Sequence, residues 1–195
     1  MRHIYFRSLC CLLAFLAINQ LTAQSPQLLD FNQQGLDHQQ RAMLILGGWA
    51  VGNIALGASL RNNSSGSTRY FHEMNIYWNL VNLGIAGFGY YSSLQQDPAS
   101  LDLYASIQRH SSFQKVLLFN AGLDIGYILG GLYLTERARR PDVNSDQLKG
   151  FGRSIILQGS FLFAFDLVNY FLSNGRNDQL QLLTSPSGLG LSYTF

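Results

Sequence analysis

The chain has 195 residues, of which 12% are charged and 47% are hydrophobic, and its formal net charge is +2. Soluble domains carry about 25% charged residues, so this composition is typical of a single membrane-embedded domain. The small net charge, without a basic patch interleaved with aromatic residues, excludes nucleic acid as a partner.

Residues 1–23 have the pattern of a secretory signal peptide. Two arginines precede the apolar run "CCLLAFLAI" at 10–18, and the polar "NQLTAQ" follows. We expect cleavage after Ala23. An uncleaved anchor is less favoured, because the run is much shorter than the ~20 residues of a membrane span. Both cysteines lie in this run, so we expect the mature chain to lack disulfides, thiolate metal sites and cysteine nucleophiles.

Four later windows are long and apolar enough to cross a bilayer as helices. They cover about 42–60, 71–93, 116–135 and 154–173. The segments between them are rich in Gly, Pro, Asn, Ser and charged residues, which is typical of loops. Strands of a transmembrane barrel would be about ten residues long with strict alternation, unlike these runs. The sequence therefore predicts an all-α integral membrane protein, a four-transmembrane-helix antiparallel bundle over residues 24–175.

The charges of the loops indicate an orientation. The loops after the first and third windows hold Arg61, Arg69, Arg137, Arg139, Arg140, Lys149 and Arg153, and the opposite side holds Arg41, Arg109, Lys115 and Arg176. An excess of Arg and Lys marks the cytoplasmic side. Together with the export signal, this predicts a multi-pass protein of the inner (cytoplasmic) membrane with both termini in the periplasm.

Polar residues recur at helical spacing inside the predicted spans. His72, Asn75, Asn79 and Asn82 are separated by three, four and three residues, which places them on one helical face. Similar faces occur in the other spans, at matching depths. We therefore expect these groups to face inward and to form hydrogen bonds between helices. The candidate intramembrane polar site comprises Asp124, Asp166, Asn53, Asn79, Asn82, Asn120 and Gln158.

Asp124 and Asp166 are the costly members of this set, since an aspartate at mid-membrane depth costs about 2.5–3.5 kcal/mol. No Lys or Arg lies inside any predicted span. The carboxyl groups must then be protonated, solvated by the amides or neutralised by a bound cation. Two functions stay open. We favour a structural or accessory membrane protein held together by its polar interior. The alternative is a proton- or cation-handling protein that uses the paired aspartates.

Glycines recur every four residues in two of the spans, at Gly48 and Gly52 and again at Gly122, Gly126 and Gly130. Such small-xxx-small patterns are typical of surfaces on which membrane helices pack closely. We expect these five positions to be helix contacts.

The chain has no motif of a known catalytic or cofactor site. "HEMN" at 72–75 lacks the second histidine of a zinc helix motif, and "GLDIGYILGG" at 122–131 lacks the lysine of a phosphate-binding loop. The sequence therefore predicts no catalytic, metal-binding or cofactor-binding residue and no enzymatic activity. The expected partners are the lipid bilayer and either a second copy of the chain or another membrane protein.

The C-terminal tail, 176–195, ends in "SGLGLSYTF", with apolar residues at alternate positions. This pattern resembles the last strand of a bacterial outer-membrane barrel. Because four apolar spans precede it, we expect a short external extended strand, paired with "QLLDF" at 27–31. An outer-membrane location is the less favoured alternative.

Three stretches carry a wider resemblance, namely "GWAVGNI" at 48–54, "FHEMNIYWNLVN" at 71–82 and "NAGLDIGYI" at 120–128. In these, the chain resembles a group of uncharacterised small membrane proteins of the Bacteroidota with signal peptides and four predicted helices. The resemblance implies a four-helix membrane fold and brings no activity, substrate or cofactor.

Overall fold

The computed structural model describes residues 25–184, which fold into four long helices and two short ones, with no strand in this range. The elements are α2 (Pro26–Arg61), α3 (Gly66–Leu94), the short 3-10 helix η1 (Pro98–Ser100), α4 (Leu103–Arg137), α5 (Ser145–Asn174) and α6 (Asn177–Thr184). The predicted signal peptide and residues 185–195 of the tail lie outside the described residues.

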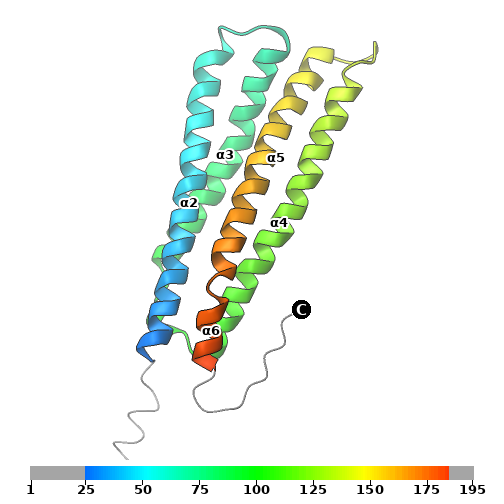
Figure 1. Cartoon of the computed structure of the whole chain (residues 1–195). Coiled ribbons are helices and arrows are strands. Elements are labelled where there is room, and N and C mark those ends of the chain that lie inside the picture. Colours follow the sequence, from blue (N-terminus) through cyan, green and yellow to red (C-terminus); the bar gives the residue numbers. More distant parts are fainter. Residues whose placement is uncertain (1–24, 185–195) are drawn as a thin grey trace, which may run out of the picture.

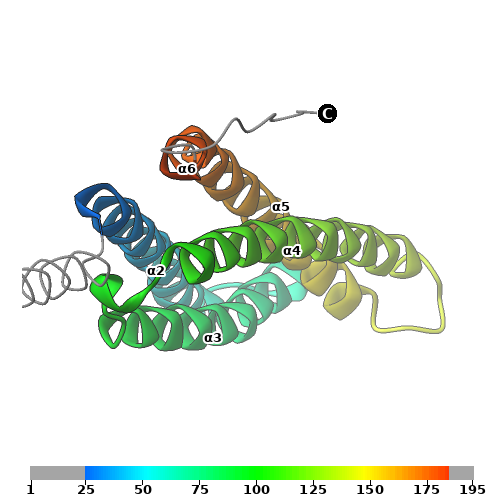
Figure 2. The same cartoon turned by 90° about the horizontal axis from the view of Figure 1, so that it is seen from below.

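The four long helices run antiparallel to their neighbours along the chain (Figure 1). Helix α3 packs against α2 and α5, and α4 packs against α5. The loops 62–65 and 138–144 lie at one end of the bundle, which we call the loop end. The start of α2, η1 and α6 lie at the other, which we call the α6 end (Figures 1 and 2).

The helices extend well beyond the apolar windows. Ser25 caps α2 by accepting a hydrogen bond of 3.2 Å from the backbone N–H of Leu28, and Pro26 supplies a preset φ in the first turn. Asp102 caps α4 in the same way, with 2.7 Å to the N–H of Ala105. At 1.5 Å per residue, the 36 residues of α2 span about 54 Å, against a hydrocarbon core of about 30 Å.

The helices α2 and α6 include residues of two segments in which the sequence predicts a short strand, 27–31 and the C-terminal tail. The segment 27–31, expected to pair as a strand, lies in the first turns of α2 because Ser25 and Pro26 start the helix there. That part of the prediction is wrong. The first residues of the predicted tail form α6, and the strand expected at 187–195 lies outside the described residues.

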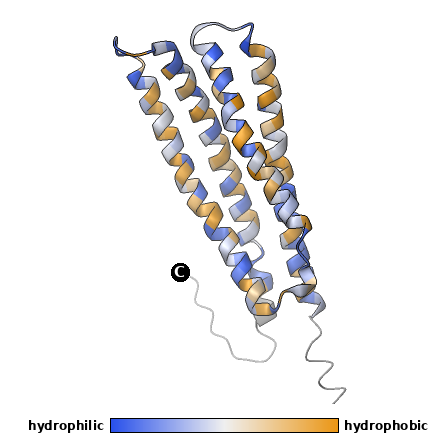
Figure 3. Ribbon diagram, turned by 180° about the vertical axis from the view of Figure 1, so that it is seen from behind, coloured by the Kyte–Doolittle hydropathy of each residue, from blue (hydrophilic) through white to orange (hydrophobic). Residues whose placement is uncertain are grey.

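The interior of the bundle is polar and its exterior is apolar. The largest fully buried side chains are Gln158, Asn79, Ser93, Ser106, Ser154 and Ser173. Large apolar side chains point outward instead, as Phe88 and Phe119 do with 75% and 67% of their surface exposed. Hydropathy colouring shows apolar residues along the helices and hydrophilic ones around the loops (Figure 3). In water such an exterior would be unfavourable, whereas lipid tails cover it without cost.

Three helices are long and apolar enough to cross a membrane, namely α2, α4 and α5 continued to Leu180. By length and composition, these helices suggest a membrane protein. Helix α3 has 29 residues, enough to span, yet it is not among these three, and asparagines interrupt its apolar stretch. The expected fourth span therefore stays a prediction.

Close helix contacts occur at glycines other than the expected ones. The positions of Gly48, Gly52, Gly122, Gly126 and Gly130 all face open space, so a Cβ there would meet nothing within 4 Å. The prediction that these five glycines form helix contacts within the bundle is therefore wrong. A four-residue repeat shows that the glycines share one face of a helix, but it does not show whether that face points into the bundle or away from it.

Helices α4 and α5 instead approach each other at two other glycines. A Cβ on Gly152 would lie 2.6 Å from the carbonyl oxygen of Gly131, and one on Gly131 would lie 2.7 Å from that of Gly152. Neither position can therefore hold a side chain without separating the two backbones.

Candidate functional site

An amide cluster joins α2, α3 and α5 in the half of the bundle nearer the loop end. Its centre is Gln158, whose side-chain amide donates to Asn53 Oδ1 over 3.3 Å and to Asn75 Oδ1 over 3.0 Å. Asn75 Oδ1 also accepts 2.6 Å from the hydroxyl of Ser154. Trp49 completes the set by donating its indole N–H to Gln158 Oε1 over 2.8 Å.

This cluster is saturated at its centre. Gln158 is fully buried and uses both amide hydrogens and its carbonyl oxygen. The side-chain amide of Asn53 donates a hydrogen bond of 2.9 Å to the backbone carbonyl oxygen of Trp49. A buried amide with every group paired adds stability and leaves no vacant donor for a ligand.

The sequence found only part of this amide cluster. It singled out Asn53 and Gln158, which the structure brings together, but it left Asn75 and Ser154 out of the candidate site. The indole ring of Trp49 also stacks on Phe161, with ring centroids 3.8 Å apart. The spacing of four residues between Trp49 and Asn53 predicts that they share one helical face, and both contact Gln158.

Asn79 and Asn82 continue the polar face of α3. Asn79 is fully buried and donates to the backbone carbonyl of Asn75 over 2.8 Å, and Asn82 donates to Asn79 Oδ1 over 3.4 Å. These bonds stay within α3. Asn79 is therefore buried inside the bundle, but its hydrogen bonds within residues 25–184 do not join two helices as the sequence predicts.

Asp124 of α4 and Asp166 of α5 form a carboxyl pair. Both residues are buried, and their carboxyl groups are close enough to interact directly. Asp124 Oδ2 is fully enclosed and has no hydrogen-bond partner in the described part of the chain. Unlike the amide cluster, this pair retains an unused acceptor.

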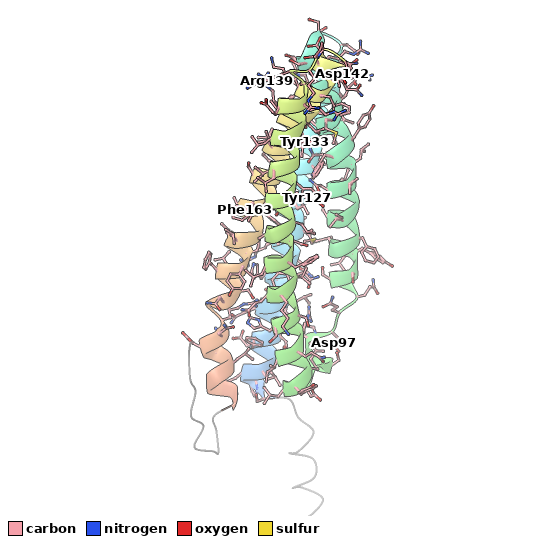
Figure 4. The ribbon with its side chains drawn as sticks, turned by 90° about the vertical axis from the view of Figure 1, so that its right-hand side faces the viewer. Asp97, Tyr127, Tyr133, Arg139, Asp142 and Phe163 are labelled. Atoms are coloured by element: carbon pink, nitrogen blue, oxygen red, sulfur yellow. The ribbon has the colours of Figure 1, made fainter. Side chains whose placement is uncertain are left out.

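The carboxyl pair lines a groove of about 570 Å³. The walls of the groove are mainly apolar, and they include Trp78 of α3 and Tyr127 of α4, whose rings meet edge to face at 4.9 Å. Tyr127 lies about midway along the bundle (Figure 4). Asn82 and Asn120 also line the groove, so four polar candidates from three helices meet there.

The groove opens toward the apolar exterior. Tyr77 and Val81 of α3 and Val116 of α4 line it and are themselves exposed. An occupant would therefore contact apolar walls, with a few polar groups among them, as in most small-molecule sites. No group of three or more His, Cys, Asp or Glu that could hold a metal ion occurs among residues 25–184.

A family model decides the relationship of the chain to known proteins. The DUF6992 model, described as a family of unknown function, matches residues 45–167. The chain belongs to this family. No curated protein and no solved structure matches it.

The DUF6992 match contains both polar features described above. It begins within α2 before Trp49 and ends in α5 just after Asp166, so the amide cluster and the carboxyl pair lie inside it. A DUF6992 relationship agrees with the expected resemblance to uncharacterised proteins. The bacterial group and the signal peptide stay predictions.

A second polar cluster lies near the α6 end, with all its members except His110 outside the DUF6992 match, and the sequence did not single it out. His38 of α2 contacts Asn169 Oδ1 of α5 through Nε2 over 2.9 Å, and Arg176 donates to His38 Nδ1 over 3.4 Å. The imidazole of His110 in α4 lies 2.7 Å from Asn177 Oδ1. His38, His110, Arg176 and Asn177 lie outside the four apolar windows, where hydropathy gives no signal, whereas Asn169 lies within the window 154–173.

Proposed function

We propose that this DUF6992 chain is an integral membrane protein with a structural or accessory role, rather than an enzyme. The observation that carries the proposal is the saturated amide cluster around Gln158. Its polar groups are used up in joining α2, α3 and α5, so they serve to hold the bundle in one arrangement. Lipid, a second copy of the chain or another membrane protein would cover the apolar exterior.

Helix α3 is proposed to cross the membrane together with the three more apolar helices. Its amides Asn75, Asn79 and Asn82 are all turned inward and buried. Its outward side carries large apolar side chains such as Leu80 and Phe88. A helix that shields its polar groups in this way can contact lipid despite a moderate mean hydropathy.

The loop end is proposed to face the cytoplasm of a bacterial cell, in the inner membrane, with the α6 end in the periplasm. Seven of the eleven Arg and Lys residues counted around the predicted spans belong to the loop end. Arg139, at this end in Figure 4, is one of them.

Reporter insertions test this arrangement. An alkaline phosphatase reporter at 62–65 or 138–144 should be inactive, and one placed at 96–97 should be active, because the enzyme matures only in the periplasm. Activity at 62–65 with none at 96–97 would reverse the orientation. Activity at both would exclude α3 as a span. Separation of inner from outer membranes tests the location.

Variants of the carboxyl pair and of Gln158 test the structural role. If the protein acts only as a scaffold, the Asp124→Asn/Asp166→Asn double variant should keep the melting temperature profile and the particle size of the wild type in detergent. Gln158→Leu should instead lower the melting temperature. A double variant that loses a response to pH or cations would contradict a purely structural role.

A second candidate function, the handling of a proton or cation, is favoured by the unpaired Asp124 Oδ2 at a groove that also holds Asp166. A buried carboxyl without a partner is stabilised by a proton or a cation. The test is the melting temperature of wild type and double variant from pH 4 to 9, with and without Na⁺, K⁺ or Mg²⁺. Asp142→Asn, an exposed loop carboxyl, is the control. Coinciding curves would rule this candidate out.

A further inference from the structure

Two guanidinium groups meet near the α6 end without a negative charge to balance them. Arg109 of α4 and Arg176, which follows α5, line one cavity and are close enough for their charges to repel each other. Neither forms an ion pair with any carboxylate of residues 25–184. Paired like charges in a partly enclosed place are unfavourable unless an anion joins them.

Arg176 is held in place while several of its donors stay unused. Its Nε and Nη1 atoms are enclosed and have no hydrogen-bond partner in the described chain. Its Nη2 donates to His38 Nδ1 over 3.4 Å, and its guanidinium lies 5.9 Å from the ring centre of Phe31. A guanidinium whose N–H groups lack an acceptor within the protein is suited to bind the oxygens of an anion.

The absence of a side chain at Gly35 makes room for this guanidinium. A Cβ at this position of α2 would lie 3.1 Å from Arg176 Nη1, which is closer than most carbon contacts. His38 is also oriented for its role, because its Nε2 faces the carbonyl oxygen of Asn169 and must donate to it. Its Nδ1 is then unprotonated and accepts the hydrogen bond from Arg176.

The cavity itself has a volume of about 60 Å³, whereas one water needs roughly 10–15 Å³. Arg109 has a weak contact of 3.4 Å to Gln39 Oε1 and can turn toward an occupant. Asp37 lies on the adjoining surface, where it accepts a hydrogen bond of 2.8 Å from the side-chain amide of Gln33, and no carboxylate of residues 25–184 lines the cavity itself. The cavity is therefore lined by positive charge and by hydrogen-bond donors.

We propose that Arg109 and Arg176 form a binding site for a phosphate group. Planar guanidinium groups match the oxygens of phosphate in a bidentate manner. The site is on the extended part of the bundle beyond its most apolar stretches, at the level where lipid headgroups lie. A phosphate there can come from an anionic lipid or from free phosphate in solution. The site does not depend on the structural role or on the carboxyl pair.

The test measures binding to the purified full chain in detergent, in two arms at constant ionic strength. One arm adds inorganic phosphate and the other adds phosphatidylglycerol, with phosphatidylcholine for comparison. The readout is the rise in melting temperature and the apparent affinity from its concentration dependence. The variants are Arg176→Gln and Arg109→Gln. Arg139→Gln, at the loop end with a side chain 77% exposed, removes the same charge as a control.

The expected result is a rise in melting temperature for the wild type and for Arg139→Gln in at least one arm. Each of the two site variants should lower the apparent affinity at least tenfold. A response to phosphatidylglycerol alone assigns the site to a lipid headgroup, and a response to inorganic phosphate assigns it to the free ion.

Two results would overturn the proposal. One is the absence of any response of the wild type in both arms. The other is an equal loss in Arg139→Gln and the site variants, which would indicate general charge attraction. If Arg176→Gln does not fold, Arg109→Gln decides, because the one side-chain hydrogen bond of Arg109 within residues 25–184 is the weak one to Gln39.

Discussion

Trp49 and Gln158 join α2 to α5 by a hydrogen bond of 2.8 Å between the indole Nε1 and the amide Oε1. The two residues are 109 positions apart in the chain, and Gln158 also bonds to α3 through Asn75. One buried side chain therefore holds three helices in register. Without it, Trp49 Nε1 and Asn53 Oδ1 would lose these hydrogen bonds, whereas Asn75 Oδ1 would keep the one from the hydroxyl of Ser154.

Replacing Gln158 by leucine should destabilise the bundle by about 1–3 kcal/mol, because Trp49 Nε1 loses its acceptor and Asn53 and Asn75 lose a donor. The measurement is the unfolding of the purified protein in detergent. Gln108→Leu, an exposed position on α4, should change stability little. An equal effect of both substitutions would contradict the central place of Gln158.

Replacing Trp49 by phenylalanine should have a smaller effect, about 0.6 kcal/mol, the mean for hydrogen bonds between membrane helices. Phenylalanine keeps a ring that can stack on Phe161 and removes only the N–H donor. In Gln158→Leu, which lacks the acceptor already, the same change should cost almost nothing. A double-mutant cycle measures this coupling. Additive losses would show that the bond contributes no stability.

Replacing Gly152 by alanine should destabilise the contact between α4 and α5 by about 1–3 kcal/mol. The new Cβ would lie 2.5 Å from Thr135 Oγ1 and 2.6 Å from the backbone oxygen of Gly131, so the helices must separate. Gly126→Ala is the matched control on α4, since open space surrounds it. It should be neutral or stabilising by up to about 1 kcal/mol. Thermal unfolding of both variants distinguishes the two positions.

Replacing Glu73 by glutamine should lower stability at low salt. Its Oε1 accepts from Arg61 Nε at 2.9 Å and from Arg69 Nε at 3.2 Å, and its side chain is only 11% exposed. Glu136, which is 68% exposed and pairs with Arg139, provides the control. Glu136→Gln should stay within about 0.5 kcal/mol, as exposed ion pairs do. The difference between the two should shrink as salt is added.

Hydropathy predicted the existence and the type of the long helices, because an apolar window of about twenty residues has few other outcomes. It could not predict where they begin. Helix α2 starts at Pro26 and α4 at Leu103, both well before the apolar windows. The decisive signals there are the caps Ser25 and Asp102, which are short-range and easily missed among polar residues.

Helical periodicity predicted that the amides of α3 face inward, and Asn75, Asn79 and Asn82 are indeed buried. Periodicity cannot assign the hydrogen-bond partners of these residues. It shows which residues share one face of a helix, but not how far that face lies from the other helices. For this reason the acceptor role of Gln158 toward Trp49 and the contact at Gly152 emerged only from the three-dimensional arrangement. The meeting of Asp124 with Asp166 likewise required both the rotation and the axial shift of α4 against α5.

The antiparallel arrangement also has a consequence for counting spans in related sequences. The start of α2 and the end of α5 lie at the same end of the bundle (Figure 1). A hydropathy count of three spans is odd and would place these two points on opposite sides of a membrane. The packing of α3 between α2 and α5 makes the number of crossings even whenever those two helices cross. The parity of the topology therefore depends on whether α3, which is not among the three helices that are long and apolar enough to cross, also spans the membrane.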